Sequence, residues 1–147
     1  MIFLAAKNAK GAKNAKEVGM TEEESRQLCD IIRQTAYDLH VYLGIGYLEK
    51  VYENGLAHRL LKSGHDVKRQ VPVQVVDEDG FVLGDYIADM IVDGIVVELK
   101  AVSTLLPAHM AQCLNYLKAM KIEYGLIINF GAEKFQCRKL ALSRDKP

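Results

Sequence analysis

The period of the hydrophobic positions changes near residue 67. In residues 22–62 they recur every three or four positions, which is typical of amphipathic helices and predicts helices over about 22–43 and 48–62. From residue 67 on, β-branched apolar runs between turn residues predict strands. These strands are 67–76, 81–83, 87–92, 95–100, 126–130 and 135–140, with a third helix over 106–120. The order ααββββαββ predicts an α/β domain with a mixed β-sheet flanked by helices.

Residues 1–19 differ from the rest in composition. They carry four lysines against one glutamate, and residues 7–16 hold a lysine at every third position. We expect a flexible, basic, low-complexity tail, which is either an arm that contacts phosphates or a dispensable extension. Thr21 and Glu24 have the spacing of a capping box at a helix start. We therefore expect a single folded domain over 20–147.

Composition narrows the classes of protein that fit. The chain has 147 residues, half of them hydrophobic, and its 19 Lys and Arg are balanced by 19 Asp and Glu. Zero net charge excludes a globally basic surface, so any binding to nucleic acid must come from a local site. No apolar run approaches the ~18 residues of a membrane span, and three scattered cysteines argue against a disulfide framework or a zinc ribbon. We expect a cytoplasmic protein without a membrane partner.

A central hairpin is predicted where Asp93 and Gly94 separate two apolar runs. Asp-Gly between such runs is typical of a two-residue type I′ turn. The numbers of paired residues then sum to 187, which sets Asp89 directly opposite Glu98. Opposed residues share one face of a sheet, and Lys100 lies on that face as well.

Two carboxylates facing each other on a covered sheet destabilise it unless they have partners. One carboxyl could be protonated, Lys100 could neutralise the pair, or a divalent cation could bridge it. A plain salt bridge among Asp89, Glu98 and Lys100 is the simpler alternative. Three charged residues on one face of two apolar strands make a poor core, so we favour a site for a hard cation such as Mg²⁺, which prefers oxygen ligands.

The same residues resemble a known family. Asp89, eight intervening residues and then Glu98-Leu99-Lys100 resemble the motif of the PD-(D/E)xK nuclease superfamily. Residues 46–52 read GxxExxY, the motif that names the GxxExxY family within this superfamily. Residues 112–116 read QxxxY, which marks a branch of these nucleases. The chain departs from the pattern at Ala88, where the superfamily often has proline.

The resemblance implies a restriction-endonuclease-like fold and a nuclease that hydrolyses phosphodiester bonds with Mg²⁺ or Mn²⁺, in DNA rather than RNA. The implied catalytic residues are Glu49, Asp89, Glu98 and Lys100. The implied metal ligands are Glu49, Asp89, Glu98 and the backbone carbonyl of Leu99. The residues implied to support the site or contact the substrate are Tyr52, Gln112 and Tyr116.

Three of these roles have a local alternative. Glu49 also suits the first turn of a helix, where a carboxylate interacts favourably with the helix dipole. Tyr52 also suits a packed core, and Gln112 also suits the polar side of an amphipathic helix. Glu53, one turn after Glu49, is expected to be a solvent-exposed helix charge.

A second class of function also fits the sequence. The domain could be a non-catalytic nucleic-acid-binding or regulatory module that retains the nuclease fold, because the chain is small and has zero net charge. Basic residues for a phosphate backbone are also few. Lys118 and Lys121 near the end of the third helix belong to this modest set. A small domain covers little nucleic acid alone, so a homodimer is a reasonable expectation that no sequence feature establishes.

Overall fold

The computed structural model describes residues 19–143. The expected basic tail therefore lies, except for Gly19, outside the described residues. The helices are α2 (Glu22–Leu43), α3 (Glu49–Lys62) and α4 (Pro107–Met120). The strands are β1 (Val67–Val76), β2 (Val82–Val92), β3 (Ile95–Lys100), β4 (Tyr124–Asn129) and β5 (Gln136–Ala141).

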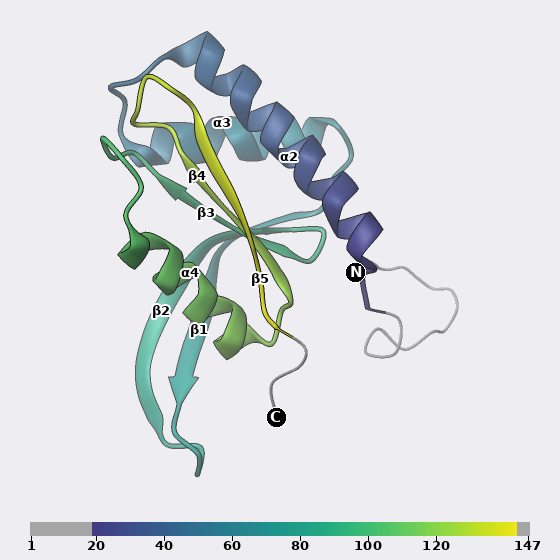
Figure 1. Cartoon of the computed structure of the whole chain (residues 1–147), viewed down its shortest axis with the longest axis vertical. Helices are drawn as coiled ribbons and strands as arrows, with labels where there is room; N and C mark the ends of the chain where they lie inside the picture. Colours follow the sequence, from purple (N-terminus) through teal and green to yellow (C-terminus); the bar gives the residue numbers. More distant parts are fainter. Residues whose placement is uncertain (1–18, 144–147) are drawn as a thin grey trace.

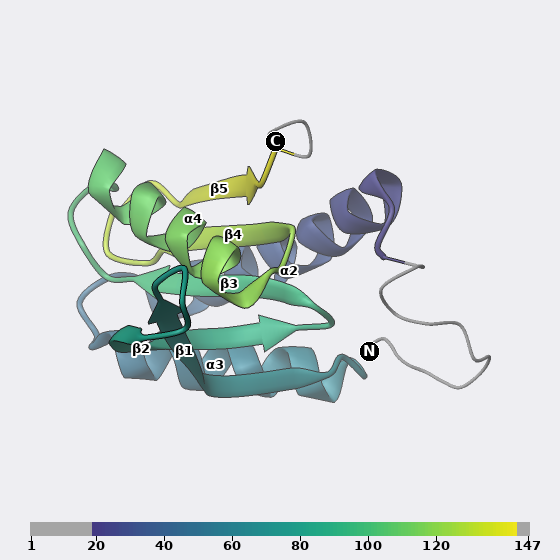
Figure 2. The same cartoon turned by 90° about the horizontal axis from the view of Figure 1, so that it is seen from below.

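One mixed sheet organises the domain, with strand order β1-β2-β3-β4-β5. β3 and β4 are parallel and connected through α4, whereas the other neighbouring strands are antiparallel. α2 and α3 pack on one face of the sheet and α4 covers the other (Figures 1 and 2). The predicted α/β class with a mixed, helix-flanked sheet is confirmed.

The start of α2 shows why the first helix begins where the sequence predicts. The Thr21 hydroxyl accepts the Glu24 backbone N–H at 3.0 Å, and the Glu24 carboxylate accepts the Thr21 N–H at 3.0 Å. This reciprocal capping box satisfies two backbone donors that the helix itself leaves unpaired. The predicted bounds 22–43 are confirmed.

The predicted break in the second strand is wrong. Strands were expected over 81–83 and 87–92, but β2 is continuous from residue 82 to residue 92. Residues 84–86 interrupt the apolar pattern, yet they pair with residues 73–75 of β1 and stay extended. β1 and β2 thus form a long hairpin that projects from the body of the domain (Figure 1). Pro72 lies in the edge strand β1, as its missing N–H requires.

A buried asparagine fixes the end of β3. The Asn129 amide nitrogen donates to the Val102 carbonyl at 2.9 Å and to Gln136 Oε1 at 2.8 Å. Its oxygen accepts the N–H groups of Val102 and Gly131, both at 3.0 Å. Gly131 has no room for a side chain, because a Cβ there would lie 2.3 Å from the Val102 nitrogen. The segment that leaves β3 after Lys100 is therefore held tightly against the end of β4.

Residues 19–143 bear on two expectations, one about membrane-spanning segments and one about disulfides. No helix in this part of the chain is long and apolar enough to cross a bilayer. The three cysteines, Cys29, Cys113 and Cys137, are free thiols rather than disulfide partners.

Candidate metal centre

The turn between β2 and β3 has the predicted geometry. Asp93 and Gly94 have φ angles of 46° and 91°, the left-handed conformation that a type I′ turn requires at both positions. The strand pairs run from Val92–Ile95 to Met90–Val97, and their residue numbers sum to 187. The predicted register is confirmed for these pairs.

Beyond Met90 and Val97 the two strands stop pairing, so the expected direct backbone pair between Asp89 and Glu98 is not formed. Here the two carboxylates accept backbone N–H groups instead. The Asp89 N–H donates to Glu98 Oε2 at 2.8 Å, and the Leu99 N–H donates to Asp89 Oδ2 at 2.8 Å. The Asp89 carboxylate thus occupies the place where a backbone carbonyl of β2 would accept the Leu99 N–H in a regular ladder.

Glu98 is buried and Asp89 is partly buried, and the electrostatics of the pair reflect this burial. Glu98 is only 4% exposed. Burial and then the charge of Asp89 raise the pKa of Glu98 to about 8. Burial also raises the pKa of Asp89, against the opposing effect of its hydrogen bond with the Leu99 N–H. Two such groups resist being ionised together unless a positive charge joins them.

The donor set fits a divalent cation. One oxygen of each carboxyl accepts a backbone N–H, and no backbone N–H within residues 19–143 reaches the other oxygen. The Leu99 N–H points toward β2, and the carbonyl of the same residue points to the same side of the strand. Hard cations bind carboxylate and carbonyl oxygens of this kind.

Lys100 lies beside the acid pair. Its ammonium group donates to Gln112 Oε1 at 3.1 Å, and its charge lowers the pKa values of both Asp89 and Glu98. Tyr116, one turn after Gln112 on α4, is 7% exposed. Burial and then the two carboxylates raise the pKa of its hydroxyl. The structure therefore brings Lys100, Gln112 and Tyr116 to the face of the sheet that carries the pair.

The charges of the site shift the pKa of Glu49, but its side chain does not join the acid pair. It is the first residue of α3 and is exposed. Burial of part of the side chain and then the charge of Asp89 raise its pKa, whereas Lys100 lowers it. Among residues 19–143, no group of three or more His, Cys, Asp or Glu side chains is close enough to hold an ion.

Tyr52 lies in the core rather than at an accessible surface. Its side chain is fully buried, and its ring stacks on Phe130 with centroids 4.7 Å apart. The hydroxyl donates to the Gly44 carbonyl at 2.7 Å and accepts the Tyr47 N–H at 3.3 Å. Tyr52 thus holds the loop that leads into α3, and a direct contact with substrate is excluded in this conformation.

The expectation for Glu53 is wrong. Its side chain is buried, with 4% of the residue exposed, and binds Arg69 and Gln70 of β1. Helical position alone gave no signal of this burial, because both partners lie on a strand that follows in the sequence. Sequence reasoning therefore missed a charged residue whose field also raises the pKa of Asp89.

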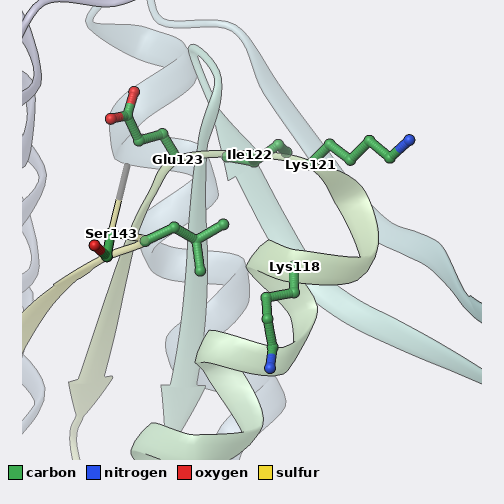
Figure 3. A pocket seen from close by; sticks show the side chains of 6 residues that line it. Lys118, Lys121, Ile122, Glu123 and Ser143 are labelled. Carbon is green, nitrogen blue, oxygen red and sulfur yellow. The ribbon is translucent and has the colours of Figure 1, made fainter. Parts of the chain in front are cut away.

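Two of the expected basic residues lie elsewhere. Lys118 and Lys121 flank a surface pocket at the C-terminal end of α4, where their ammonium groups point away from each other (Figure 3). The other lining residues are Ile122, Glu123, Leu142 and Ser143. This pocket includes neither carboxyl of the pair, so it is a separate surface feature.

Comparison with known proteins agrees with the geometry. A family model described as the PD-(D/E)XK nuclease superfamily matches residues 26–140, and the chain therefore belongs to this superfamily. The solved structure of the protein SSO0001 is similar, with a TM-score of 0.53 and 18% sequence identity over 88% of this chain and 74% of that one. At this identity the likeness supports the fold alone. No curated protein matches the chain.

Proposed function

We propose that the protein is a Mg²⁺- or Mn²⁺-dependent nuclease that hydrolyses phosphodiester bonds in DNA. The observation that carries this proposal is the pair of partly buried Asp89 and buried Glu98 at the point where β2 and β3 part, with Lys100 beside it. A fold in need of stability alone gains little from such a pair, because two like charges out of water cost free energy. Membership in a nuclease superfamily supports the same conclusion.

The proposed ligands are the carboxylates of Asp89 and Glu98 and the backbone carbonyl of Leu99. Glu49 would take part through a bound water, since its exposed side chain lies outside the pair but within range of its field. Mg²⁺ characteristically keeps several waters and needs few protein ligands. When bound, the cation would lower the pKa of a water and polarise a phosphoryl oxygen.

The remaining side chains have roles that follow from their contacts. Lys100 would place a positive charge where negative charge develops on the phosphoryl group in the transition state. Gln112 fixes the position of that ammonium group through its 3.1 Å hydrogen bond. The raised pKa of Tyr116 keeps its hydroxyl protonated and able to donate a hydrogen bond to a phosphate oxygen.

We also propose that the chain belongs to the GxxExxY branch of the superfamily. Residues 46–52 carry the motif, and its two named side chains have distinct tasks. The charge of Asp89 acts on the pKa of Glu49. Tyr52, in contrast, is buried and binds the loop that precedes Glu49. The motif would therefore couple a charged group at the site to the core residue that fixes its loop.

The proposal is tested by cleavage assays on the full chain with duplex DNA, single-stranded DNA and RNA, each with Mg²⁺, Mn²⁺ or EDTA. We expect metal-dependent cleavage of DNA that Asp89→Asn abolishes. Asp85→Asn is the matched control, because Asp85 lies on the same strand and its carboxylate only accepts a hydrogen bond from Gln74. Cleavage that persists in Asp89→Asn would contradict the proposal, and binding of DNA without cleavage would favour the non-catalytic module.

A further inference from the structure

The edge strand β1 has an irregularity directly beside the acid pair. Gln70 has a φ of 53°, a left-handed conformation that is unusual for a residue other than glycine. β1 pairs with β2 on both sides of Gln70, but the pair between Gln70 and Asp89 is missing. Asp89 has also lost its backbone partner on β3. The residue that carries the central carboxylate is therefore unpaired on both neighbouring strands.

A buried carboxylate on α3 holds this irregularity in place. Glu53 Oε2 accepts the Arg69 Nε–H at 2.9 Å, and Glu53 Oε1 accepts the Gln70 amide at 3.0 Å. Consecutive side chains of a regular strand point to opposite faces, yet here two of them reach one carboxylate. The left-handed backbone at Gln70 makes this convergence possible. Arg69 also donates to the side chain of Asn54, so the contact ties β1 to α3 at two points.

We propose that Glu53 is a positioning residue, which clamps the kink at Gln70 and thereby sets the place of the Asp89 carboxylate between β2 and β3. This inference rests on the proposed function for its consequence in metal binding, but its structural part does not. Glu53 is not itself a ligand in this arrangement, because both of its oxygens are already engaged by β1. Without the clamp, Gln70 would relax toward extended backbone and β1 would pull Asp89 into a regular pair.

The test compares three variants of the full chain. Glu53→Ala removes the clamp, and Glu53→Ala combined with Gln70→Gly restores a backbone that adopts positive φ freely. His40→Ala is the control for lost stability, because His40 is also a buried helical side chain, with 7% exposed and one hydrogen bond to Ala132 at 2.8 Å. His40 belongs to the other end of the sheet, near β4 and β5, rather than to β1.

Two measurements read out the position of Asp89. Amide hydrogen exchange at Leu99 reports the hydrogen bond to Asp89 Oδ2, with Val96 of the same strand as the internal reference. Titration calorimetry with Mn²⁺ reports the metal site. We expect Glu53→Ala to speed exchange at Leu99 about 10-fold relative to Val96, and to weaken Mn²⁺ binding by about 10- to 100-fold, the usual range for a residue that supports a ligand.

The rescue separates positioning from general destabilisation. Adding Gln70→Gly should return both readouts to within about 3-fold of the wild-type values, whereas a purely structural role of Glu53 gives no such return. Equal readouts in Glu53→Ala and His40→Ala would overturn the inference. Wild-type protein that binds no Mn²⁺ would overturn the proposed function instead, and the exchange at Leu99 would still decide whether Glu53 positions Asp89.

Discussion

Asn129 and the acid pair lie on the same sheet but differ in how fully their hydrogen-bonding atoms find partners. Asn129, at the end of β4, uses both its nitrogen and its oxygen, with partners on three other residues. Asp89 and Glu98, between β2 and β3, each accept one backbone N–H and face another carboxyl group. Satisfied buried amides stabilise a fold, whereas paired carboxylates out of water destabilise it.

Under the proposed function, the difference separates a group that holds the structure from a group that binds a cation. Asn129 is complete, because all its partners belong to the chain. The acid pair is not complete in this sense, because each carboxyl has one oxygen that accepts no backbone N–H from residues 19–143. Substitution at Asn129 should therefore lower stability, whereas substitution at the pair should lower catalysis or metal affinity and should not lower the stability of the metal-free protein.

The largest expected effect is on catalysis at Lys100. Lys100→Ala should lower kcat for DNA cleavage by about 10²–10³-fold, equivalent to about 3–4 kcal/mol, because a preformed charge next to the phosphoryl group is lost. Binding of Mn²⁺ should be retained, since the carboxylates remain. Steady-state cleavage kinetics and calorimetry measure the two effects. Lys118→Ala on the same face of the domain is the control, and an equal loss of kcat there would contradict a specific role for Lys100.

The second effect is on stability at Asn129. Asn129→Ala should lower the free energy of unfolding by about 3 kcal/mol, because the partly buried N–H groups of Val102 and Gly131 lose their acceptor. Urea denaturation measures it. Asn115→Ala, at an exposed position of α4, should change stability by less than about 0.5 kcal/mol. Similar losses of stability for both variants would contradict a specific stabilising role for the hydrogen bonds of Asn129.

The third effect is the pH dependence of the metal-free protein. The pKa of Glu98 is about 8 in the folded state against an ordinary value of 4.5. Between these values the folded chain keeps a proton that the unfolded chain has released, so stability should fall as pH rises from about 5 to 8. The slope from this group is at most about 1.4 kcal/mol per pH unit.

Glu98→Gln should remove this slope, because the amide mimics the protonated acid and keeps an oxygen for the Asp89 N–H. In EDTA at pH 8 we expect the variant to be about 2 kcal/mol more stable than the wild type, and nearly equal to it at pH 5. Thermal and urea unfolding across this range supply the data. A variant that is less stable than the wild type at pH 8 would show that the acids form a stabilising network instead.

The smallest effect is at Tyr52, where a polar group serves the fold next to the site. Tyr52→Phe keeps the ring stacked on Phe130 but removes the hydroxyl that binds Gly44 and Tyr47. We expect a loss of about 1 kcal/mol in unfolding free energy with metal affinity retained. Denaturation and calorimetry on one preparation distinguish this result from a direct role in binding, which would instead weaken Mn²⁺ at unchanged stability.

Much of the fold could be predicted because its signals are local. The capping box from Thr21 to Glu24 and the turn at Asp93 and Gly94 each depend on a few neighbouring residues. Continuity of β2 could not be predicted, because residues 84–86 are held extended by pairing with β1 rather than by their own preferences.

The candidate site could likewise be predicted only where its signals are local. Asp89 and Glu98 were predicted to meet because a two-residue turn fixes the register of a hairpin, although they meet through side chains rather than as a backbone pair. The burial of Glu53 depends on Arg69 and on a left-handed Gln70. No spacing rule connects these residues, because helix α3 and strand β1 are brought together by the tertiary fold.

Titration of Mn²⁺ into the wild-type chain, beside Asp89→Asn and the control Asp85→Asn, tests the central claim most directly. The claim is that the pair between β2 and β3 is a site for a divalent cation. It predicts saturable binding by the wild type and by Asp85→Asn, and loss of binding in Asp89→Asn with the fold intact by circular dichroism. Equal binding by all three proteins, or no binding by a folded wild type even with a short DNA duplex present, would contradict it.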